Sequence, residues 1–279
     1  MKGEATANGA ATIINAIAGY RGVAYATTLK TKATVELKPN QKEIKGDAGR
    51  IDPTLIEKTV KKTLNYYNKD QGAYVKTQSN IPVARGLKSS SAAANATALA
   101  TISALNIERN NQEILEITIE AAKEAEVTIT GAMDDATASL LGGITITNNE
   151  KNKLIERREK NHKALIYIPQ KKEYTKRTDV EKTRLLTKEI KKAYELAKNH
   201  HIYEAMTING ILYSTALDQD PEIILEALEA GAEAASLSGT GSAYTALVKQ
   251  KNLQRVKQKW KKHGKVIETK INNEGAKIL

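Results

Sequence analysis

The hydrophobic and polar positions of the chain change period several times, and each change marks a predicted element. Residues 22–38 alternate and predict one or two strands, whereas Ile56, Val60 and Leu64 recur on one face of a helix that Asp52-Pro53 opens. The same reasoning predicts the remaining elements. Helices are expected over residues 89–106, 111–127, 179–199, 202–216 and 251–263 and after Asp220-Pro221, and strands over residues 73–78, 144–148, 164–169 and 265–271.

Strands and helices are mixed without strict alternation, and this order favours the α+β class over a doubly wound sheet. Charge density rises over residues 150–158, which read EKNKLIERR and indicate a surface hairpin or a domain boundary. We therefore divide the chain into a domain of residues 1–155 and a second domain of residues 156–279.

Composition excludes several classes of site. The chain has no cysteine, so disulfides, thiolate metal sites and cysteine nucleophiles are all absent. The N-terminus reads MKGEATANGA, without the apolar run of a secretory signal or a membrane span, so we expect a cytoplasmic protein. Phe is absent although Tyr occurs 11 times, a pattern that compositional bias and sequence engineering explain equally well.

The positive net charge of +11 raises the possibility of a nucleic-acid ligand. The basic residues alternate with acidic ones, as in DVEKTRLLTKEIKK, which is typical of solvated helix faces. No helix-turn-helix, RNA-recognition or zinc signature occurs, and the four histidines lack metal-ligand spacing. We expect neither a nucleic-acid nor a membrane partner.

The most informative segment is a loop that leads directly into a helix beginning with three serines. Unpaired N–H groups and the positive end of the helix dipole make such a helix start a site for phosphate, and serine hydroxyls add donors and ligands for Mg²⁺. A serine-capped helix without a ligand is the alternative. No Walker A sequence occurs, which excludes a P-loop kinase. The segment consists of Pro82, Val83, Ala84, Arg85, Gly86, Leu87, Lys88, Ser89, Ser90, Ser91 and Ala92.

Alternating glycines and hydroxyl residues form a second candidate site. Such a segment lets the backbone approach an anion closely, and an ordinary glycine-rich turn is the alternative. The residues are Gly239, Thr240, Gly241 and Ser242.

Two further segments carry candidate chemistry. Glu124 precedes Asp134 and Asp135 by ten and eleven residues, so these carboxylates are candidates for one metal–phosphate centre; a solvated Glu and an Asp helix cap are the alternative. The small residues between Gly9 and Gly22 suit either the wall of a small-molecule pocket or a buried strand and tight turn. Asn15 and Arg21 are the strong polar groups there.

Taken in order, these segments resemble the GHMP kinase superfamily. PVARGLKSSSA is similar to its phosphate-binding motif, SLSGTGSA to its third, glycine-rich motif, and the carboxylates lie where its metal-binding Glu and catalytic Asp are expected. The segments GAATIINAIAGYRGVAYA, GLKSSSAAANA and TGAMDDATAS resemble the archaeal shikimate kinases. The resemblance implies an N-terminal ribosomal-S5-like β/α domain and a C-terminal ferredoxin-like α/β domain.

The same resemblance implies ATP- and Mg²⁺-dependent phosphoryl transfer to the 3-hydroxyl of shikimate. The 82–92 segment then holds the triphosphate, and Ser90 and Glu124 hold Mg²⁺. The spacing to Gly142-Gly143 selects Asp135 for the acceptor hydroxyl, whereas the dipeptide Met133-Asp134 selects Asp134, which we favour narrowly. Asn15 and Arg21 are the candidates for binding shikimate.

Two alternatives keep the fold. In the first, the protein is a kinase for another small alcohol, of the homoserine or mevalonate type. In the second, it is a non-catalytic or redesigned GHMP scaffold. The sequence leaves open whether the protein is a monomer or a homodimer.

Overall fold

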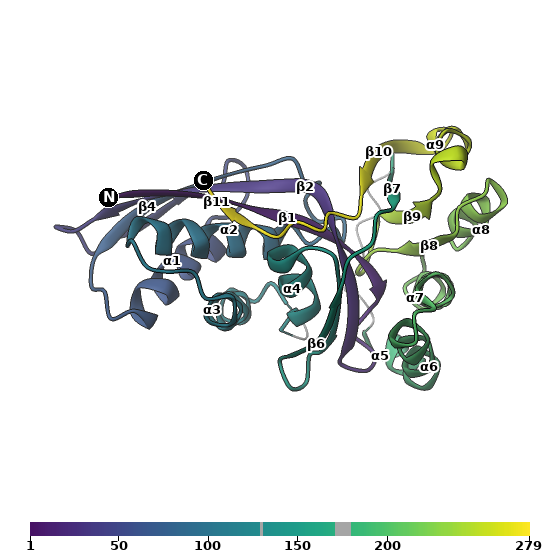
Figure 1. Cartoon of the computed structure of the whole chain (residues 1–279), viewed down its shortest axis with the longest axis horizontal. Helices are drawn as coiled ribbons and strands as arrows, with labels where there is room; N and C mark the ends of the chain where they lie inside the picture. Colours follow the sequence, from purple (N-terminus) through teal and green to yellow (C-terminus); the bar gives the residue numbers. More distant parts are fainter. Residues whose placement is uncertain (129–130, 171–179) are drawn as a thin grey trace.

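The computed structural model describes residues 1–128, 131–170 and 180–279 of the chain. In this part of the chain, a seven-stranded and a four-stranded sheet follow one another along the long axis of the molecule (Figure 1). Helices pack against both sheets, and the described elements confirm the predicted α+β class.

The first sheet is built around one long strand, β2 (Arg21–Lys38), which pairs with β1 along most of its length. One half of β2 pairs with β4 and the other half with β5, so the segment predicted as one or two strands is a single strand shared by two neighbours. The other strands of this sheet are β1 (Lys2–Ile14), β3 (Ile44–Asp47), β4 (Gly72–Ser79), β5 (Ile144–Asn148), β6 (Lys153–Arg158) and β11 (Lys277–Ile278).

Three helices lie against one face of this sheet (Figure 1): α1 (Thr54–Tyr66), α2 (Ser89–Ala104) and α4 (Met133–Leu141). The fourth helix, α3 (Asn111–Glu124), packs on these three helices. The central helix, α2, is rich in alanine and buried on nearly all sides. Its small side chains let it approach β1 closely; a Cβ added at Gly3 would lie 2.1 Å from the Ala100 carbonyl oxygen. This close approach fixes the position of the serine-rich start of α2.

The second sheet has the order β10-β7-β9-β8, which is the order of a ferredoxin-like β-α-β-β-α-β unit. Its strands are β7 (Lys163–Pro169), β8 (Ala234–Leu237), β9 (Tyr244–Val248) and β10 (Gly264–Lys270). The helices of this half are α5 (Val180–Arg184), α6 (Thr187–Lys198), α7 (Ile202–Ala216), α8 (Glu222–Glu229) and α9 (Leu253–Lys261), with a 3₁₀ turn, η1, over Gln250–Asn252.

The single helix predicted over residues 179–199 is wrong. The described residues form two helices, α5 and α6, and residue 179 lies outside the described part. The hydroxyl of Thr187 donates to the carbonyl oxygens of Arg184 (2.6 Å) and Ala18 (2.8 Å). A side-chain hydroxyl therefore takes the place of a backbone amide as hydrogen-bond donor to the last residue of α5.

The two halves share hydrophobic contacts. One buried cluster joins Ile14 and Tyr25 of the first sheet to Tyr213 and Trp260 of the second half. The last strand, β11, returns to pair with β1, and the predicted boundary between residues 155 and 156 falls inside β6.

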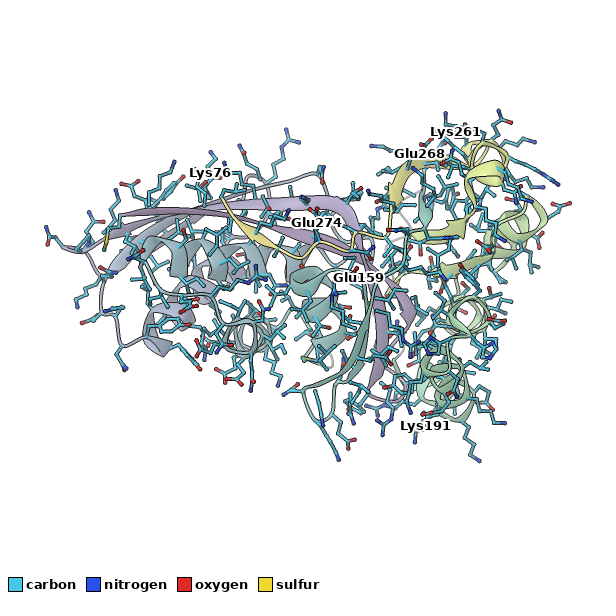
Figure 2. All side chains as sticks on the ribbon, in the orientation of Figure 1. Lys76, Glu159, Lys191, Lys261, Glu268 and Glu274 are labelled. Atoms are coloured by element: carbon cyan, nitrogen blue, oxygen red, sulfur yellow. The ribbon has the colours of Figure 1, made fainter. Side chains whose placement is uncertain are left out.

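Charged side chains occupy the periphery of both halves. Lys76, Lys191 and Lys261 lie at widely separated places in Figure 2, in keeping with the predicted solvated faces. Across the described ranges, we find no helix with the length and apolar character to cross a bilayer.

Candidate active site

Three segments that are distant in sequence meet at one cavity of about 230 Å³. They are the turn after β1, the loop before α2 and the loop between β8 and β9, and the start of α4 closes the cavity. The lining residues include Asn15, Ala16, Ile17, Ala84, Gly86, Leu87, Lys88, Ser89, Ser90, Ser91, Asp134, Asp135, Gly239 and Thr240.

The start of α2 lines the cavity and, in the described part of the chain, has no side-chain cap. Lys88 precedes the helix with φ 60° and ψ 35°, and within the described residues no side chain caps the first turn. By contrast, Asn110 caps α3 by accepting from the amides of Gln112 (3.0 Å) and Glu113 (3.4 Å). The first-turn amides of α2 therefore add their partial positive charge to the cavity wall that the three serines line.

The two glycine-containing loops pack backbone against backbone. Gly86 has φ +74°, and a Cβ there would lie 1.8 Å from the Ser238 carbonyl oxygen. The Ser238 hydroxyl donates to the Gly86 carbonyl oxygen (2.8 Å), and the Gly239 amide donates to the Thr12 hydroxyl (2.9 Å). Position 86 therefore requires glycine for two reasons: its φ is positive, and the Ser238 backbone leaves no room for a Cβ atom.

Asp134 lies in the first turn of α4 and is only 4% exposed. One carboxylate oxygen, Oδ1, accepts a hydrogen bond from Asn149 Nδ2 at 2.6 Å. A Cβ added at Gly22 would lie 2.5 Å from the Asp134 Cβ, so the glycine on β2 makes room for this side chain. Asp134 is therefore held in one orientation from two sides.

Asp135 forms an ion pair with Lys88 across the cavity, with Nζ 2.8 Å from Oδ1. Burial raises the pKa of Asp135 to about 7; the Lys88 ammonium opposes this rise, and the Asp134 carboxylate adds to it. Burial alone would lower the pKa of Lys88. The negative charges of Asp135 and Asp134 have the larger combined effect, so the pKa of Lys88 is raised. The pair thus places a proton acceptor with a pKa near neutrality beside a fixed positive charge.

Part of the predicted phosphate-binding segment supports the cavity from outside. The side chain of Arg85 donates to the hydroxyl of Ser242, which ties the two loops together. Val83 is 45% exposed. The predicted residues that do not line the cavity are Pro82, Val83, Arg85, Ala92, Gly241 and Ser242.

Asn15 lines the cavity, but its side-chain amide is engaged by the protein. Nδ2 donates to the Gly239 carbonyl oxygen (2.9 Å), and Oδ1 accepts from the Ile17 amide (3.0 Å). Arg21 does not line the cavity; its guanidinium lies over the Tyr194 ring, 5.9 Å from the ring centroid. The structure therefore gives Asn15 a role in holding the turn and does not bring Arg21 to the site.

Glu124 also lies outside the cavity, at the end of α3. Its carboxylate is 3.1 Å from Lys62 Nζ and 3.7 Å from Lys58 Nζ, and its side chain is 45% exposed. The lysine side chains lower the pKa of Glu124 and attract it to α1. The sequence spacing placed Glu124 with the aspartates, whereas in the structure the ion pairs hold it on the other side of the helix end.

Several residues at the site were missed from the sequence. Asn149 holds Asp134, and Asn209 and Tyr213 of α7 hold the turn after β1: Asn209 Oδ1 accepts from the Asn15 amide (2.9 Å), and the Tyr213 hydroxyl accepts from the Ala18 amide (2.9 Å). No local pattern marks Asn149, which lies in the polar run that follows the strand ITITN.

The donor set suits Mg²⁺ bound together with phosphates. Mg²⁺ commonly keeps several waters and takes one or two carboxylates besides substrate phosphates. The cavity supplies the Ser90 hydroxyl and the carboxylates of Asp134 and Asp135. Among the described residues, no three acidic or histidine side chains form a protein-only metal cluster.

Comparison with known proteins agrees with this geometry. The family model described as GHMP kinases N terminal domain matches residues 54–143, and the model described as GHMP kinases C terminal matches residues 202–266. The chain is 46% identical to a shikimate kinase of Methanosarcina mazei over 99% of this chain and 96% of that protein. It is 40% identical to a shikimate kinase of Methanothermobacter thermautotrophicus over 97% and 96% of the two chains.

Solved structures share the fold at low identity. The Methanococcus jannaschii mevalonate kinase superimposes with a TM-score of 0.76 at 20% identity, over 97% of this chain and 98% of that chain. The homoserine kinase of Cytophaga hutchinsonii gives a TM-score of 0.75 at 17% identity, over 100% and 97% of the two chains. The fold predicted from the motifs is thereby confirmed. With full-length relatives at 36–46% identity and both domain models matched, the chain belongs to the GHMP kinase superfamily and, within it, to the family of the archaeal shikimate kinases.

Proposed function

We propose that this protein transfers the γ-phosphoryl group of ATP to the 3-hydroxyl of shikimate. The observation that carries the proposal is that the uncapped start of α2 and the Lys88–Asp135 pair line the same cavity. The wall formed by the start of α2 suits a polyphosphate. The wall formed by the Lys88–Asp135 pair suits a hydroxyl group that must lose a proton. The relatives named above supply the identity of the acceptor.

The nucleotide phosphates bind at the start of α2 in this proposal. Backbone amides of the first turn, the hydroxyls of Ser89, Ser90 and Ser91, and the Lys88 ammonium are the donors that line this wall. Gly239 and Thr240 complete it from the opposite loop. Catalysis of phosphoryl transfer relies mainly on positioning and charge stabilisation, and a wall of fixed donors supplies both.

We assign the acceptor hydroxyl to Asp135 in preference to Asp134. A pKa near 7 suits a carboxylate that accepts a proton at neutral pH. The acceptor oxygen forms a bond to the γ-phosphorus, the bond from that phosphorus to the β–γ bridging oxygen breaks, and the hydroxyl proton passes to the Asp135 carboxylate while ADP leaves. Asp134, fixed by Asn149, lies beside Asp135 and contributes to the raised pKa of Asp135.

Bound Mg²⁺ would neutralise charge on the transferring phosphates. Ser90 is the predicted hydroxyl ligand, and Asp134 or Asp135 is the carboxylate that the cavity offers in place of Glu124. The chain itself contributes the orientation of these oxygens through Asn149 and Lys88.

A coupled ADP-release assay with shikimate, homoserine and mevalonate tests the proposal. We expect turnover with shikimate to exceed turnover with the other two alcohols by more than about 100-fold, since a site that hydrogen-bonds its substrate rejects analogues strongly. Turnover with another alcohol alone would assign a different acceptor, and nucleotide binding without turnover would indicate a non-catalytic scaffold.

The variants Asp134→Asn and Asp135→Asn, assayed separately, test the assignment of the proton acceptor. We expect the larger loss of kcat, about 100-fold or more, for Asp135→Asn. If neither variant loses more than about tenfold, roughly 1.4 kcal/mol, neither carboxylate has the assigned role.

A further inference from the structure

A second cavity, of about 590 Å³, lies at the far end of the β8–β9 hairpin from the active-site loop. It opens where β7 begins and where β9 and β10 end, next to the first turn of α7. We name it the lysine cavity, after the residues that line it: Lys160, Asn161, His162, Lys163, Tyr203, Glu233, Val248, Lys249, Gln250 and Lys270.

The lysine cavity has an excess of positive charge. Four lysines line it, and Glu233 is the carboxylate among the lining residues. Glu233 lies 3.1 Å from Lys249 Nζ and 2.8 Å from His162 Nε2, so it is already occupied. Of the described carboxylates, none forms an ion pair with Lys160, Lys163 or Lys270. These three lysines have no ion-pair partner among the described carboxylates, and only the longer-range charges of Glu268 and Glu274 act on Lys163 and Lys270.

The register of the sheet adds to this excess. Lys163 of β7 and Lys270 of β10 are direct cross-strand partners in an antiparallel pair. Like charges directly opposite one another destabilise a sheet, so the fold places these lysines together at a cost. A bound anion between them would convert the repulsion into two attractive contacts.

The half-buried imidazole of His162 is affected by the positive charge of the lysine cavity. Burial lowers the pKa of His162; Glu233 acts against this shift, and the charges of Lys160 and Lys249 add to it. The His162 ring lies 5.7 Å from the Tyr203 ring, and Lys160 Nζ lies 4.8 Å from the centroid of Tyr203. Both rings line the lysine cavity together with the four lysines.

We propose that the lysine cavity binds a small phosphate-bearing anion, such as a diphosphate or a phosphate ester. A net excess of about three positive charges calls for a ligand with more than one negative charge, which a phosphate provides and a single carboxylate does not. Lysine ammonium groups bind phosphate oxygens as point charges. The concave shape admits a small ligand, and the cavity is separate from the walls assigned to ATP and shikimate.

Inorganic pyrophosphate is the probe for this site. The full-length protein is labelled with ¹⁵N, its active site is occupied by a non-hydrolysable ATP analogue, and pyrophosphate is titrated at constant ionic strength. We expect the amide signals of Val248, Lys249 and Gln250 to shift with saturation. Shifts confined to residues 89–92, or no saturable shift, would overturn the proposal without affecting the kinase assignment.

Single-charge variants separate a built site from general attraction. Lys163→Gln and Lys270→Gln should each weaken pyrophosphate binding by about tenfold, the loss of one charge-assisted hydrogen bond. The control is Lys265→Gln, which removes the same charge from an exposed position elsewhere on β10 and should leave the affinity unchanged. Equal weakening in all three variants would show non-specific attraction and refute the site.

The repulsion between Lys163 and Lys270 gives a second readout. Without pyrophosphate and at low salt, either Gln variant should unfold at a higher temperature than the parent protein, whereas the Lys265→Gln control should not. With saturating pyrophosphate, the parent should gain more thermal stability than either variant. A parent that gains no more than the variants would contradict the proposal.

Discussion

The Lys88 ammonium lies 2.8 Å from the Asp135 carboxylate, and these two residues belong to segments that are 47 positions apart in the chain. Lys88 adopts a left-handed backbone conformation just before α2, and Asp135 lies in the first turn of α4. The pair therefore connects the wall assigned to phosphate with the wall assigned to the acceptor. Removing Lys88 leaves Asp135 without its cation, whereas removing Asp135 leaves Lys88 with the charge of Asp134 alone.

We expect Lys88→Met to lower kcat by about 100-fold, because in the proposed mechanism this lysine binds phosphate and orients Asp135. The measurement is steady-state kcat and the KM for ATP. Lys76→Met is the matched control, since Lys76 forms an ion pair of the same 2.8 Å length with Asp47 on the outer part of the first sheet. A Lys88→Met variant with normal kcat would remove the lysine from the mechanism.

The rate should depend on the protonation of Asp135. Burial raises the pKa of Asp135 to about 7, and only the carboxylate form accepts a proton. We therefore expect kcat/KM to rise with pH through about 7, and we expect Asp135→Asn to abolish this rise in the residual activity. Asp47→Asn, at a carboxyl whose pKa is lowered by Lys76, should keep the rise.

The same group should make stability depend on pH. An unfolded Asp titrates near about 3.9, below the folded value of about 7. Between these values the native state binds more protons than the unfolded state, so this carboxyl lowers stability progressively as the pH rises. Urea unfolding across this range should show a smaller loss of stability with rising pH for Asp135→Asn than for the parent; an unchanged slope would contradict the raised pKa.

Gly22→Ala should disturb Asp134 directly. The new Cβ would lie 2.5 Å from the Asp134 Cβ, so one of the two must move. We expect at least a tenfold loss of kcat and a destabilisation of about 1–3 kcal/mol from overpacking. Gly19→Ala is the control, because the nearest neighbour of its Cβ would be a flexible lysine at 3.9 Å. Equal effects in both variants would argue against a specific contact.

Gly86→Ala should separate the two loops of the phosphate wall. Its Cβ would lie 1.8 Å from the Ser238 carbonyl oxygen, and its φ of +74° disfavours any side chain. We expect the KM for ATP to rise by about tenfold or more, since misplacement of a binding wall by about 1 Å is costly. Gly49→Ala has a similar φ of +69° with no atom within 4 Å, so it isolates conformational strain from the clash.

Glu124→Gln tests the position of that carboxylate. The structure pairs Glu124 with Lys58 and Lys62 outside the cavity, so we expect the dependence of the rate on Mg²⁺ concentration to change by less than about threefold, a small energy on this scale. Glu120→Gln, which removes another partner of Lys62, is the control. A loss of Mg²⁺ affinity by an order of magnitude in Glu124→Gln alone would return Glu124 to the metal site.

Local signals in the sequence were enough for most elements and for one wall of the site. The caps, breakers and apolar periods predicted α1, α2 and α7 closely, and the serine-rich helix start indicated the phosphate wall. The sequence also names Lys88 and Asp134 as candidates, because a glycine-containing loop and paired carboxylates stand out in a sequence, and both residues line the cavity. The alternation of residues 22–38 left the strand count open, since both neighbours of β2 are distant in the chain.

Long-range pairing could not be predicted in the same way. Glu124 and Arg21 were assigned from spacing and charge, but lysines of α1 hold the first and the Tyr194 ring lies under the second. Conversely, Asn149 and Asn209 carry no local signal of their contacts, because the residues they orient are 15 and 194 positions away. The helix break after Arg184 likewise depends on a hydrogen bond from Thr187 to a distant turn.

The hydrophobic cluster that joins the ends of β1 and β2 to α7 and α9 has a consequence for motion. A hinge rotation that separated the two halves would expose this cluster to water, at a large free-energy cost. The shared cluster therefore favours a fixed relative position of the two sheets throughout the catalytic cycle.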